Sequence, residues 1–148
     1  MVKPIPEGYR TVTPYLTVPN ASELLDFVKS ALGAAEIYSH KGPDGSIGHA
    51  EVRIGDSMVM LGQAHGEWKP MPACLYLYVP DCDAVYRKAL AAGAKSVSEP
   101  KDQFYGDRHG GVKDPSGNVW WIATHIEDVS SEEVARRAAK AQASTQSV

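Results

Sequence analysis

The sequence predicts an α+β protein in which one βαβββ unit occurs twice within a single domain. The segment YLTVPN, which starts at Tyr15, returns 61 residues later as YLYVPD at Tyr76. Small-residue clusters at Ala31–Ala34 and Ala91–Ala94 recur at a spacing of 60 residues. Because self-similarity at a fixed spacing is typical of a repeated structural unit, the two halves are expected to share one fold. The total of 148 residues fits one domain.

The first copy begins with a strand and a capped helix. Thr11–Val18 is rich in Thr, Val and Tyr and stops at Pro19, which predicts a strand. Asn20 has the side chain of a helix N-cap, and Glu23 stands at the capping-box spacing. The helix is expected to end at Gly33, since glycine tolerates the left-handed conformation that closes many helices. Its apolar face consists of Ala21, Leu24, Leu25, Val28 and Leu32.

Three strands complete the first copy, and the second copy repeats the same order. The three strands are predicted at Glu36–His40, His49–Ile54 and Ser57–Leu61. The second copy has a strand over Cys74–Val79, a helix from Asp81 to about Gly93, a short strand near Ser96 and a hairpin turning at Asp114–Gly117. Between the short strand near Ser96 and the hairpin, Glu99–Arg108 is expected to be an irregular loop. Its candidate binding groups are Gln103, Tyr105, Asp107 and Arg108.

These elements divide the single domain into four parts. The first repeat spans about residues 9–62, a linker 63–72, the second repeat about 73–127, and a C-terminal helix and tail 128–148. Ser130 and Glu133 form another capping box before a helix over Val134–Ala141, and the tail beyond is expected to fray. Because a lone βαβββ unit leaves one sheet face unshielded, the copies are expected to join into one curved mixed eight-stranded sheet, with helices on one face and a cleft on the other.

Strand alternation assigns side chains to the helix side or to the cleft. In the first strand Val12, Pro14, Leu16 and Val18 should face the helices, which leaves Tyr15 toward the cleft. The predicted core consists of Leu16, Leu24, Leu25, Val28, Val52, Ile54, Leu75, Leu77, Val79 and Leu90. The cleft is aromatic with a few polar groups, as small-molecule sites commonly are. Its candidate ligand-binding residues are Tyr15, Arg53, Met60, Cys74, Tyr76, Tyr78, Tyr105, Arg108 and Trp121.

Composition and charge exclude several classes of partner. Fifteen Lys and Arg against eighteen Asp and Glu give a formal charge of −3, so no nucleic-acid or anionic-membrane partner is expected. No apolar run is long enough for a signal peptide or a membrane span, which predicts a cytoplasmic protein. The two cysteines, Cys74 and Cys82, are expected to remain reduced thiols because the intervening strand separates them. A small molecule is the expected partner.

The paired units and three segments carry a resemblance to a known superfamily. The segments are TPYLTVPNA, GPDGSIGHAEVRIGDSMVML and DRHGGVKDPSGNVWWIATH. Together they resemble the vicinal oxygen chelate superfamily of glyoxalase I, bleomycin-resistance proteins, fosfomycin-resistance enzymes and extradiol dioxygenases, and within it the PhnB-like subgroup. The resemblance covers about Tyr9 to Glu127. It implies the two-unit fold, and a homodimer, because single-chain two-copy members are commonly dimers.

The resemblance also locates the positions that hold a metal in the metal-dependent members. Those positions are Thr13, Met60, Cys74 and Trp121 here. Of these, only Cys74 is a competent ligand for a divalent ion, because Thr is a poor ligand, Met is soft and the Trp ring does not coordinate. The family's metal site is therefore predicted to be absent, and no cofactor is expected.

His49, Glu51 and His109 are the candidate catalytic residues. Imidazole titrates near neutrality and a carboxylate tunes it, so the three could form a proton shuttle or a displaced metal site. Alternatively the two histidines reflect only a shared ancestor of the repeats, and Glu51 forms a solvated pair with Arg53. Arg108 could clamp an anionic ligand or simply pair with Asp107 on the surface.

Two functional hypotheses follow. The first is a metal-independent protein that binds or sequesters a small molecule, as the resemblance to bleomycin-resistance proteins implies. The second is a superfamily enzyme, a lyase, isomerase or transferase, that uses a displaced or non-family site. The absent ligands favour the first hypothesis, and the polar residues in the cleft favour the second. In either case a homodimer is expected, with the second subunit completing or bordering the cleft.

Overall fold

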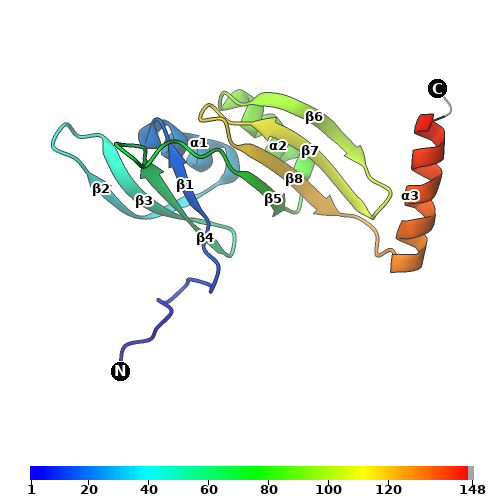
Figure 1. The fold of residues 1–148 in the computed structure, drawn as a ribbon, viewed down its shortest axis with the longest axis horizontal. Helices are drawn as coiled ribbons and strands as arrows, with labels where there is room; N and C mark the ends of the chain where they lie inside the picture. The colour runs from blue at the N-terminus through cyan, green and yellow to red at the C-terminus, as the bar shows by residue number, and fades with distance from the viewer. Residues whose placement is uncertain (147–148) are drawn as a thin grey trace.

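The computed structural model describes residues 1–146 as eight strands and three helices (Figure 1). The first unit contains β1 (Tyr15–Val18), α1 (Ala21–Leu32), β2 (Ala35–Lys41), β3 (Ile47–Ile54) and β4 (Ser57–Gln63). The second unit contains β5 (Cys74–Tyr78), α2 (Cys82–Ala91), β6 (Lys95–Asp102), β7 (Asp107–Lys113) and β8 (Val119–His125). Helix α3 (Ser131–Gln146) follows. The α+β class and the two βαβββ units are therefore confirmed.

The strands form two separate four-stranded sheets rather than the single eight-stranded sheet that was expected. Their orders are β1-β4-β3-β2 and β5-β8-β7-β6, and in each sheet the first strand pairs in parallel while the other pairs are antiparallel. The reason lies at the edge of β1, where the amide of Met71 donates to the carbonyl of Thr17 at 3.0 Å. The linker thus pairs with β1 at this point, and the two sheets lie side by side (Figure 1).

Helices α1 and α2 begin where the sequence predicted, and a side chain of the last strand of the same sheet holds each of them. The side chain of Asn20 accepts from the amide of Glu23, and Asp81 accepts from Ala84 in the same way. In addition, Gln63 on β4 accepts from the first amide of α1 at 2.9 Å, and Thr124 on β8 accepts from the first amide of α2 at 2.9 Å. These side-chain caps satisfy amides that have no partner within a helix.

The core lies between each sheet and its helix, and α1 also packs against α2. Leu16, Leu24, Leu25, Val28 and Val52 are buried as predicted. Ile54, Leu75, Leu77 and Val79 are only partly buried, because they border a groove of about 700 Å³ between the two units. Two predictions of burial are wrong: Leu90 is 37% exposed on α2, and Val12 is 82% exposed because β1 starts at Tyr15 rather than at Thr11.

A buried carboxylate organises the hairpin between β7 and β8. Asp114 is 4% exposed and accepts from the indole nitrogen of Trp120 at 2.8 Å and from the side-chain amide of Asn118 at 2.9 Å. It also accepts from the backbone amides of Ser116 and Asn118. Trp120 and Asn118 are fully buried, so this carboxylate supplies partners to donors that have no access to water.

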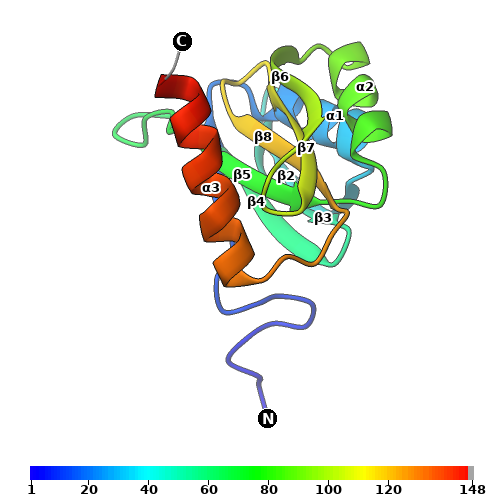
Figure 2. The ribbon, with the colours of Figure 1, turned by 90° about the vertical axis from the view of Figure 1, so that its right-hand side faces the viewer.

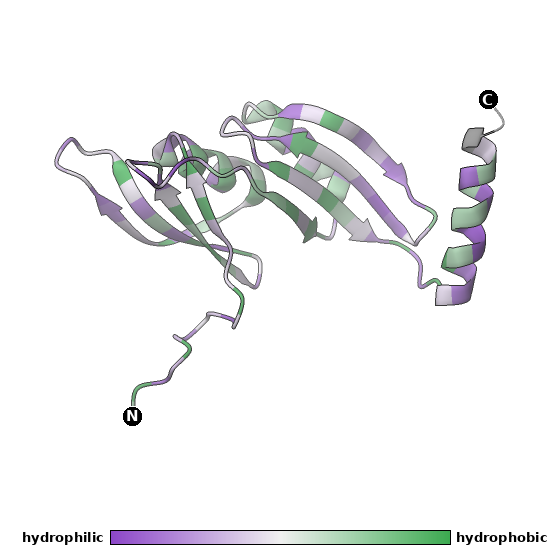
Figure 3. Ribbon diagram, in the orientation of Figure 1, coloured by the Kyte–Doolittle hydropathy of each residue, from purple (hydrophilic) through white to green (hydrophobic). Residues whose placement is uncertain are grey.

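Helix α3 lies away from the two helices of the repeats. Figure 2 shows α3 on the opposite side of the sheets from α1 and α2. Its described side chains are exposed or half-buried, and Arg137 ties it to Glu127 and to the carbonyl of Phe104. Figure 3 shows hydrophilic residues along most of α3. The helix continues to Gln146, beyond its predicted end at Ala141, and residues 147–148 of the tail lie outside the described residues.

The segment expected to be an irregular loop is mostly sheet. Strand β6 runs to Asp102 and β7 starts at Asp107, so only residues 103–106 form the turn. The pairing of β6 with β7 has register shifts between Ser96 and Lys101, so this strand lacks the regular alternation by which a strand is predicted. Among the helices of residues 1–146, none is long and apolar enough to cross a membrane.

Candidate ligand-binding site

Each sheet has one face covered by its helix and one face that no helix within residues 1–146 covers. We define the first open face by the side chains of Tyr15, His49, Glu51, Arg53, Met58 and Met60. We define the second open face by those of Cys74, Tyr76, Tyr78, Asp107, His109, Trp121 and His125. The two faces belong to neighbouring sheets, so they lie beside one another within the chain (Figure 1). The predicted cleft residues are therefore divided between two sheets.

On the first open face Tyr15, His49 and Glu51 form a chain of polar contacts. The hydroxyl of Tyr15 lies 3.2 Å from His49 Nδ1, and His49 Nε2 lies 3.2 Å from a carboxylate oxygen of Glu51. When His49 is neutral, Nε2–H donates to Glu51 and Nδ1 accepts from Tyr15. The ring of Tyr38 on β2 lies 6.4 Å from His49. The predicted His49–Glu51 pair therefore exists, and it connects to an exposed tyrosine.

A pocket of about 400 Å³ adjoins this face beneath the linker. Tyr15, Thr17, Gly62, His65 and Trp68 line it together with Gln63. Tyr15 lies directly over Gly62, where a Cβ would clash with the phenol ring. Trp68 is 71% exposed on the linker, so its indole borders the pocket while most of its surface faces solvent. This arrangement offers a planar ligand two aromatic side chains.

The second open face carries a larger aromatic cluster. The ring of His109 packs edge-on against Trp121 at 5.1 Å and against Tyr76 at 5.7 Å. Tyr105 stacks on His109 and its hydroxyl lies 2.6 Å from Nε2. Tyr76 in turn lies 5.3 Å from Tyr78. The predicted residues Tyr76, Tyr78, Tyr105 and Trp121 are thus brought together. The exposed Cys74 is the first residue of β5.

Asp107 is the polar centre of this cluster. It is 4% exposed, and one of its oxygens accepts from the hydroxyls of Tyr76 at 2.8 Å and Tyr78 at 2.9 Å. The other oxygen lies 2.9 Å from Nδ1 of His125, whose Nε2 lies 2.8 Å from Asp128. One carboxylate therefore holds two tyrosines of β5 and a histidine of β8.

Hydrogen bonding and burial set the protonation states of this group. Burial of Asp107 opposes its ionisation, but the hydrogen bonds from His125, Tyr76 and Tyr78 outweigh burial and lower the pKa of this carboxyl. The bonds to Asp107 and Asp128 raise the pKa of His125. Burial, followed by the bond to Asp107, raises the pKa of Tyr76. Burial lowers the pKa of His109, which favours its neutral form.

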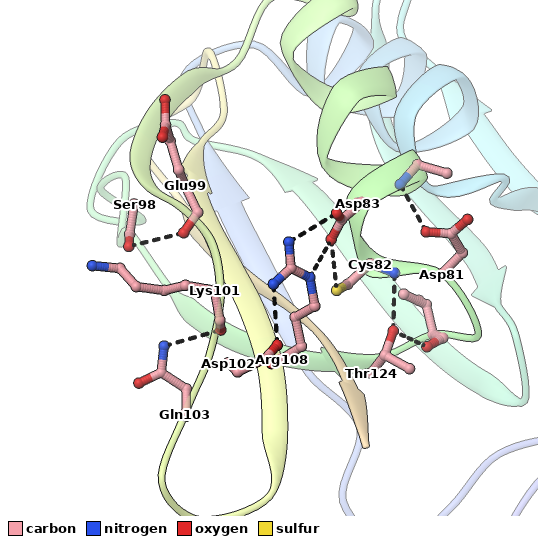
Figure 4. A network of polar contacts seen from close by, with 12 residues as sticks. Asp81, Cys82, Asp83, Ser98, Glu99, Lys101, Asp102, Gln103, Arg108 and Thr124 are labelled. Carbon is pink, nitrogen blue, oxygen red and sulfur yellow. Dashed lines mark hydrogen bonds and ion pairs between the residues drawn. The ribbon is translucent and has the colours of Figure 1, made fainter. Parts of the chain in front are cut away.

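Arg108 does not belong to either open face. Its guanidinium bonds both oxygens of Asp83 at the start of α2, at 2.9 and 3.0 Å, and Asp102 of β6 at 3.1 Å (Figure 4). These bonds raise the pKa of Arg108. Because Arg108 follows Asp107 and precedes His109 on a strand, its side chain has to point to the opposite face. Neither expected role, an anion clamp in the cleft or a pair with Asp107, agrees with this placement.

The residues at the family's metal positions do not form a ligand set. Thr13 donates its hydroxyl to the carbonyl of Arg10 at 3.1 Å. Trp121 lies over Gly111, where a Cβ would clash with the indole ring, and an indole cannot coordinate a metal. Met60 and Cys74 belong to different sheets. Within residues 1–146 no group of three or more His, Cys, Asp and Glu side chains is arranged to hold a metal ion.

The three candidate catalytic residues are not brought together. His49 and Glu51 pair on β3, whereas His109 lies on β7 of the other sheet. The central position of Asp107, its bond to His125 and the proximity of Tyr38 to His49 were not anticipated. Alternation places Asp107 on the same face as His109, which is a signal that the sequence contains. The contacts of Asp107 with the tyrosines of β5 depend on strand order and have no local sequence signal.

A family model and proteins from two mycobacteria match this chain. Residues 10–122 match the family model described as the Glyoxalase/Bleomycin resistance protein/Dioxygenase superfamily. Uncharacterized protein Rv0887c of Mycobacterium tuberculosis is 35% identical over 134 residues, which cover 83% of this chain and 79% of that protein. Uncharacterized protein Mb0911c of Mycobacterium bovis is also 35% identical, with 83% and 88% covered.

Solved structures share the fold at lower identity. TioX from Micromonospora sp. ML1 aligns with a TM-score of 0.69 and 21% identity, covering 79% of this chain and 99% of TioX. A glyoxalase/bleomycin resistance protein/dioxygenase family enzyme from Burkholderia phytofirmans PsJN aligns with a TM-score of 0.63 and 18% identity, covering 77% and 97%. The family model spans most of both repeats, including all the residues that define the two open faces except His125. The chain therefore belongs to the glyoxalase/bleomycin resistance protein/dioxygenase superfamily.

Proposed function

We propose that the protein binds a small aromatic molecule between the first open face of one copy and the second open face of another, without a metal. The observation that carries this proposal is the exposure of aromatic side chains on both faces. Tyr15 is 53% exposed, Tyr76 42% and Tyr78 65%. Exposed aromatic clusters of this kind mark binding surfaces, because their contact with water is unfavourable.

The total surface area supports a second copy as the cover. The chain exposes 9395 Å². A compact monomer of 16.0 kDa would expose about 7,400 Å². The excess of roughly 2,000 Å² exceeds the ~800 Å² that each partner buries in a standard specific interface. The N-terminal segment and α3 contribute to this excess, and both would be available to a partner.

The arrangement of the sheets supports a two-fold pairing. Since the open faces lie side by side, the chain alone does not place one over the other (Figure 1). A two-fold axis would set the first face of each copy against the second face of its partner and create two equivalent sites. Helix α3 projects on the side away from α1 and α2 (Figure 2), where it would border such a site.

Oligomeric state and binding can be tested together. Light scattering over a range of micromolar concentrations is expected to give twice the chain mass, and a mass near 16.0 kDa that persists as concentration rises would refute the shared site. In a thermal-shift screen, an aromatic compound that binds is expected to raise the melting midpoint of the protein, because a ligand bound only by the native state stabilises that state. Tyr78→Ala should reduce the shift. Val97→Ala, at an exposed apolar residue outside the two faces, is the matched control.

A superfamily enzyme is the second candidate, and the contacts of His49 favour it. Glu51 is placed to fix the tautomer of His49, and His49 Nδ1 is placed to accept a proton from Tyr15 or from a substrate. An aromatic ligand that is chemically unchanged after prolonged incubation with the protein favours binding alone. Turnover that His49→Asn abolishes without loss of binding would instead identify an enzyme.

Two further expectations belong to this proposal. We infer a place in the PhnB-like subgroup from the TPYLTVPNA and VKDPSGNVWWIATH segments. We infer a cytoplasmic location, with which the two free cysteines, Cys74 and Cys82, agree. Fractionation of cells that express the tagged full chain checks the second expectation.

A further inference from the structure

We propose that Asp107 fixes the direction of the Tyr76 and Tyr78 hydroxyl protons on the second open face, so that these two residues favour ligands that present an N–H donor. The inference rests on the proposed small-molecule site and names the chemistry that the site recognises. It starts from the contacts of one buried carboxylate. Both tyrosine hydroxyls that reach Asp107 end on the same oxygen, at 2.8 and 2.9 Å.

The carboxylate determines where the tyrosine protons lie. An ionised carboxylate has only acceptor sites, so each group that bonds to it has to donate. Tyr76 and Tyr78 each have one hydroxyl proton, and both protons point at Asp107. The remaining hydrogen-bonding capacity of the two phenol oxygens is therefore lone pairs. Tyr76 and Tyr78 are among the exposed residues of the chain, so a ligand that reaches these two phenol oxygens meets lone pairs rather than protons.

His125 keeps Asp107 in the state that this role requires. Its Nδ1 bonds the second oxygen of Asp107 at 2.9 Å while its Nε2 bonds Asp128 at 2.8 Å. With both ring nitrogens engaged by carboxylates, His125 is held as a donor and does not compete for the tyrosine protons. Lys101 pairs in register with His109, but it belongs to β6, the strand of this sheet that lies farthest from β5. Its strand is therefore not adjacent to the one that carries Tyr76 and Tyr78.

On the first open face Tyr15 has the same polarity by a different route when His49 is neutral. With neutral His49, Tyr15 donates to Nδ1, and Nε2–H donates to Glu51. Tyr15 and Tyr76 occupy equivalent positions of the repeat, and each ring centroid lies 5.7 Å from that of its histidine. In both units a carboxylate thus draws the tyrosine proton inward, once directly and once through a histidine. A ligand between the two faces would meet phenol lone pairs on both sides.

Indole and benzofuran form a probe pair that isolates this property. The two bicyclic rings have nearly the same shape and no charge, but indole has an N–H donor where benzofuran has an acceptor oxygen. Ligand-observed NMR titration of the full chain gives both dissociation constants. We expect indole to bind about two- to tenfold more tightly, which is the range of one net hydrogen bond. Equal affinity, or tighter binding of benzofuran, would overturn the inference.

Variants assign the selectivity to Asp107. Asp107→Ala frees the tyrosine protons to rotate outward, so the ratio of the two affinities should fall toward one. The Tyr76→Phe/Tyr78→Phe double variant keeps the rings and should give the same result if Asp107→Ala is poorly folded. Asp26→Ala removes an equal charge from an exposed position on α1, away from both open faces, and should leave the ratio unchanged.

The outcomes separate this inference from the function on which it rests. A ratio that survives Asp107→Ala and the double tyrosine variant would show that the selectivity arises elsewhere, and the inference would be wrong. If both probes bind equally, the aromatic site stands and only the role of Asp107 is overturned. If neither probe binds at millimolar concentration, the proposed aromatic site is itself refuted, together with the selectivity assigned to it.

Discussion

The two buried aspartates of the second unit are expected to differ sharply in their contribution to stability. Asp114→Ala removes the acceptor of Trp120 Nε1 and Asn118 Nδ2, and both residues are fully buried. An unsatisfied buried donor costs about 1–3 kcal/mol, so leaving these two side-chain donors without an acceptor should lower the free energy of unfolding by about 2–6 kcal/mol. That is a large share of the ~5–15 kcal/mol typical of a domain.

Asp107→Ala removes the partner of three side chains, one more than Asp114→Ala, but should cost less. Its partners Tyr76 and Tyr78 are exposed, as is His125, so water can replace the lost carboxylate. We expect a loss of about 1–2 kcal/mol, the scale of one or two net hydrogen bonds. The contrast would identify Asp114 as a carboxylate that maintains the fold and Asp107 as one whose main role lies on the open face.

Urea denaturation at one fixed protein concentration measures both losses, because association would otherwise shift the midpoint. Asp44→Ala is the control, since Asp44 accepts from Ser46 in an exposed turn, and it should change the midpoint little. The reasoning fails if Asp107→Ala is as destabilising as Asp114→Ala, or if Asp114→Ala shifts the free energy of unfolding by less than about 1 kcal/mol.

Three further results are expected. Leu16→Ala should cost about 2–5 kcal/mol in urea denaturation because Leu16 is 1% exposed in the core; a cost near zero would contradict this packing. The pKa of His125 is raised above its ordinary value of 6.5, so its stabilisation is complete below that pH and is lost as the pH rises through the folded value; His125→Gln should therefore lower the urea midpoint more at pH 6 than at pH 9. Treatment with a chelator should leave the melting midpoint unchanged, and stoichiometric zinc, nickel or iron at Thr13, Met60, Cys74 and Trp121 in protein purified without added metal would refute the prediction.

Local sequence determined the elements and the face to which each side chain points. Asn20 and Asp81 mark the helix starts because their side chains accept the free amides of the first turn. Alternation along β8 puts Trp120 in the core and leaves Trp121 partly exposed on the open face. These features depend on residues a few positions apart, and the periodicity of a strand or helix is sufficient to predict them.

Tertiary structure decided which of those side chains meet. The two sheets remain separate because Met71 pairs with β1, so His109 never approaches His49 and Glu51. Arg108 binds Asp83, 25 residues earlier, and Tyr78 reaches Asp107 across β8. Periodicity within one element does not specify strand order, register or the path of a linker. The sequence therefore predicted one aromatic cleft, and only the fold established that its residues divide between two open faces and which carboxylate each face contains.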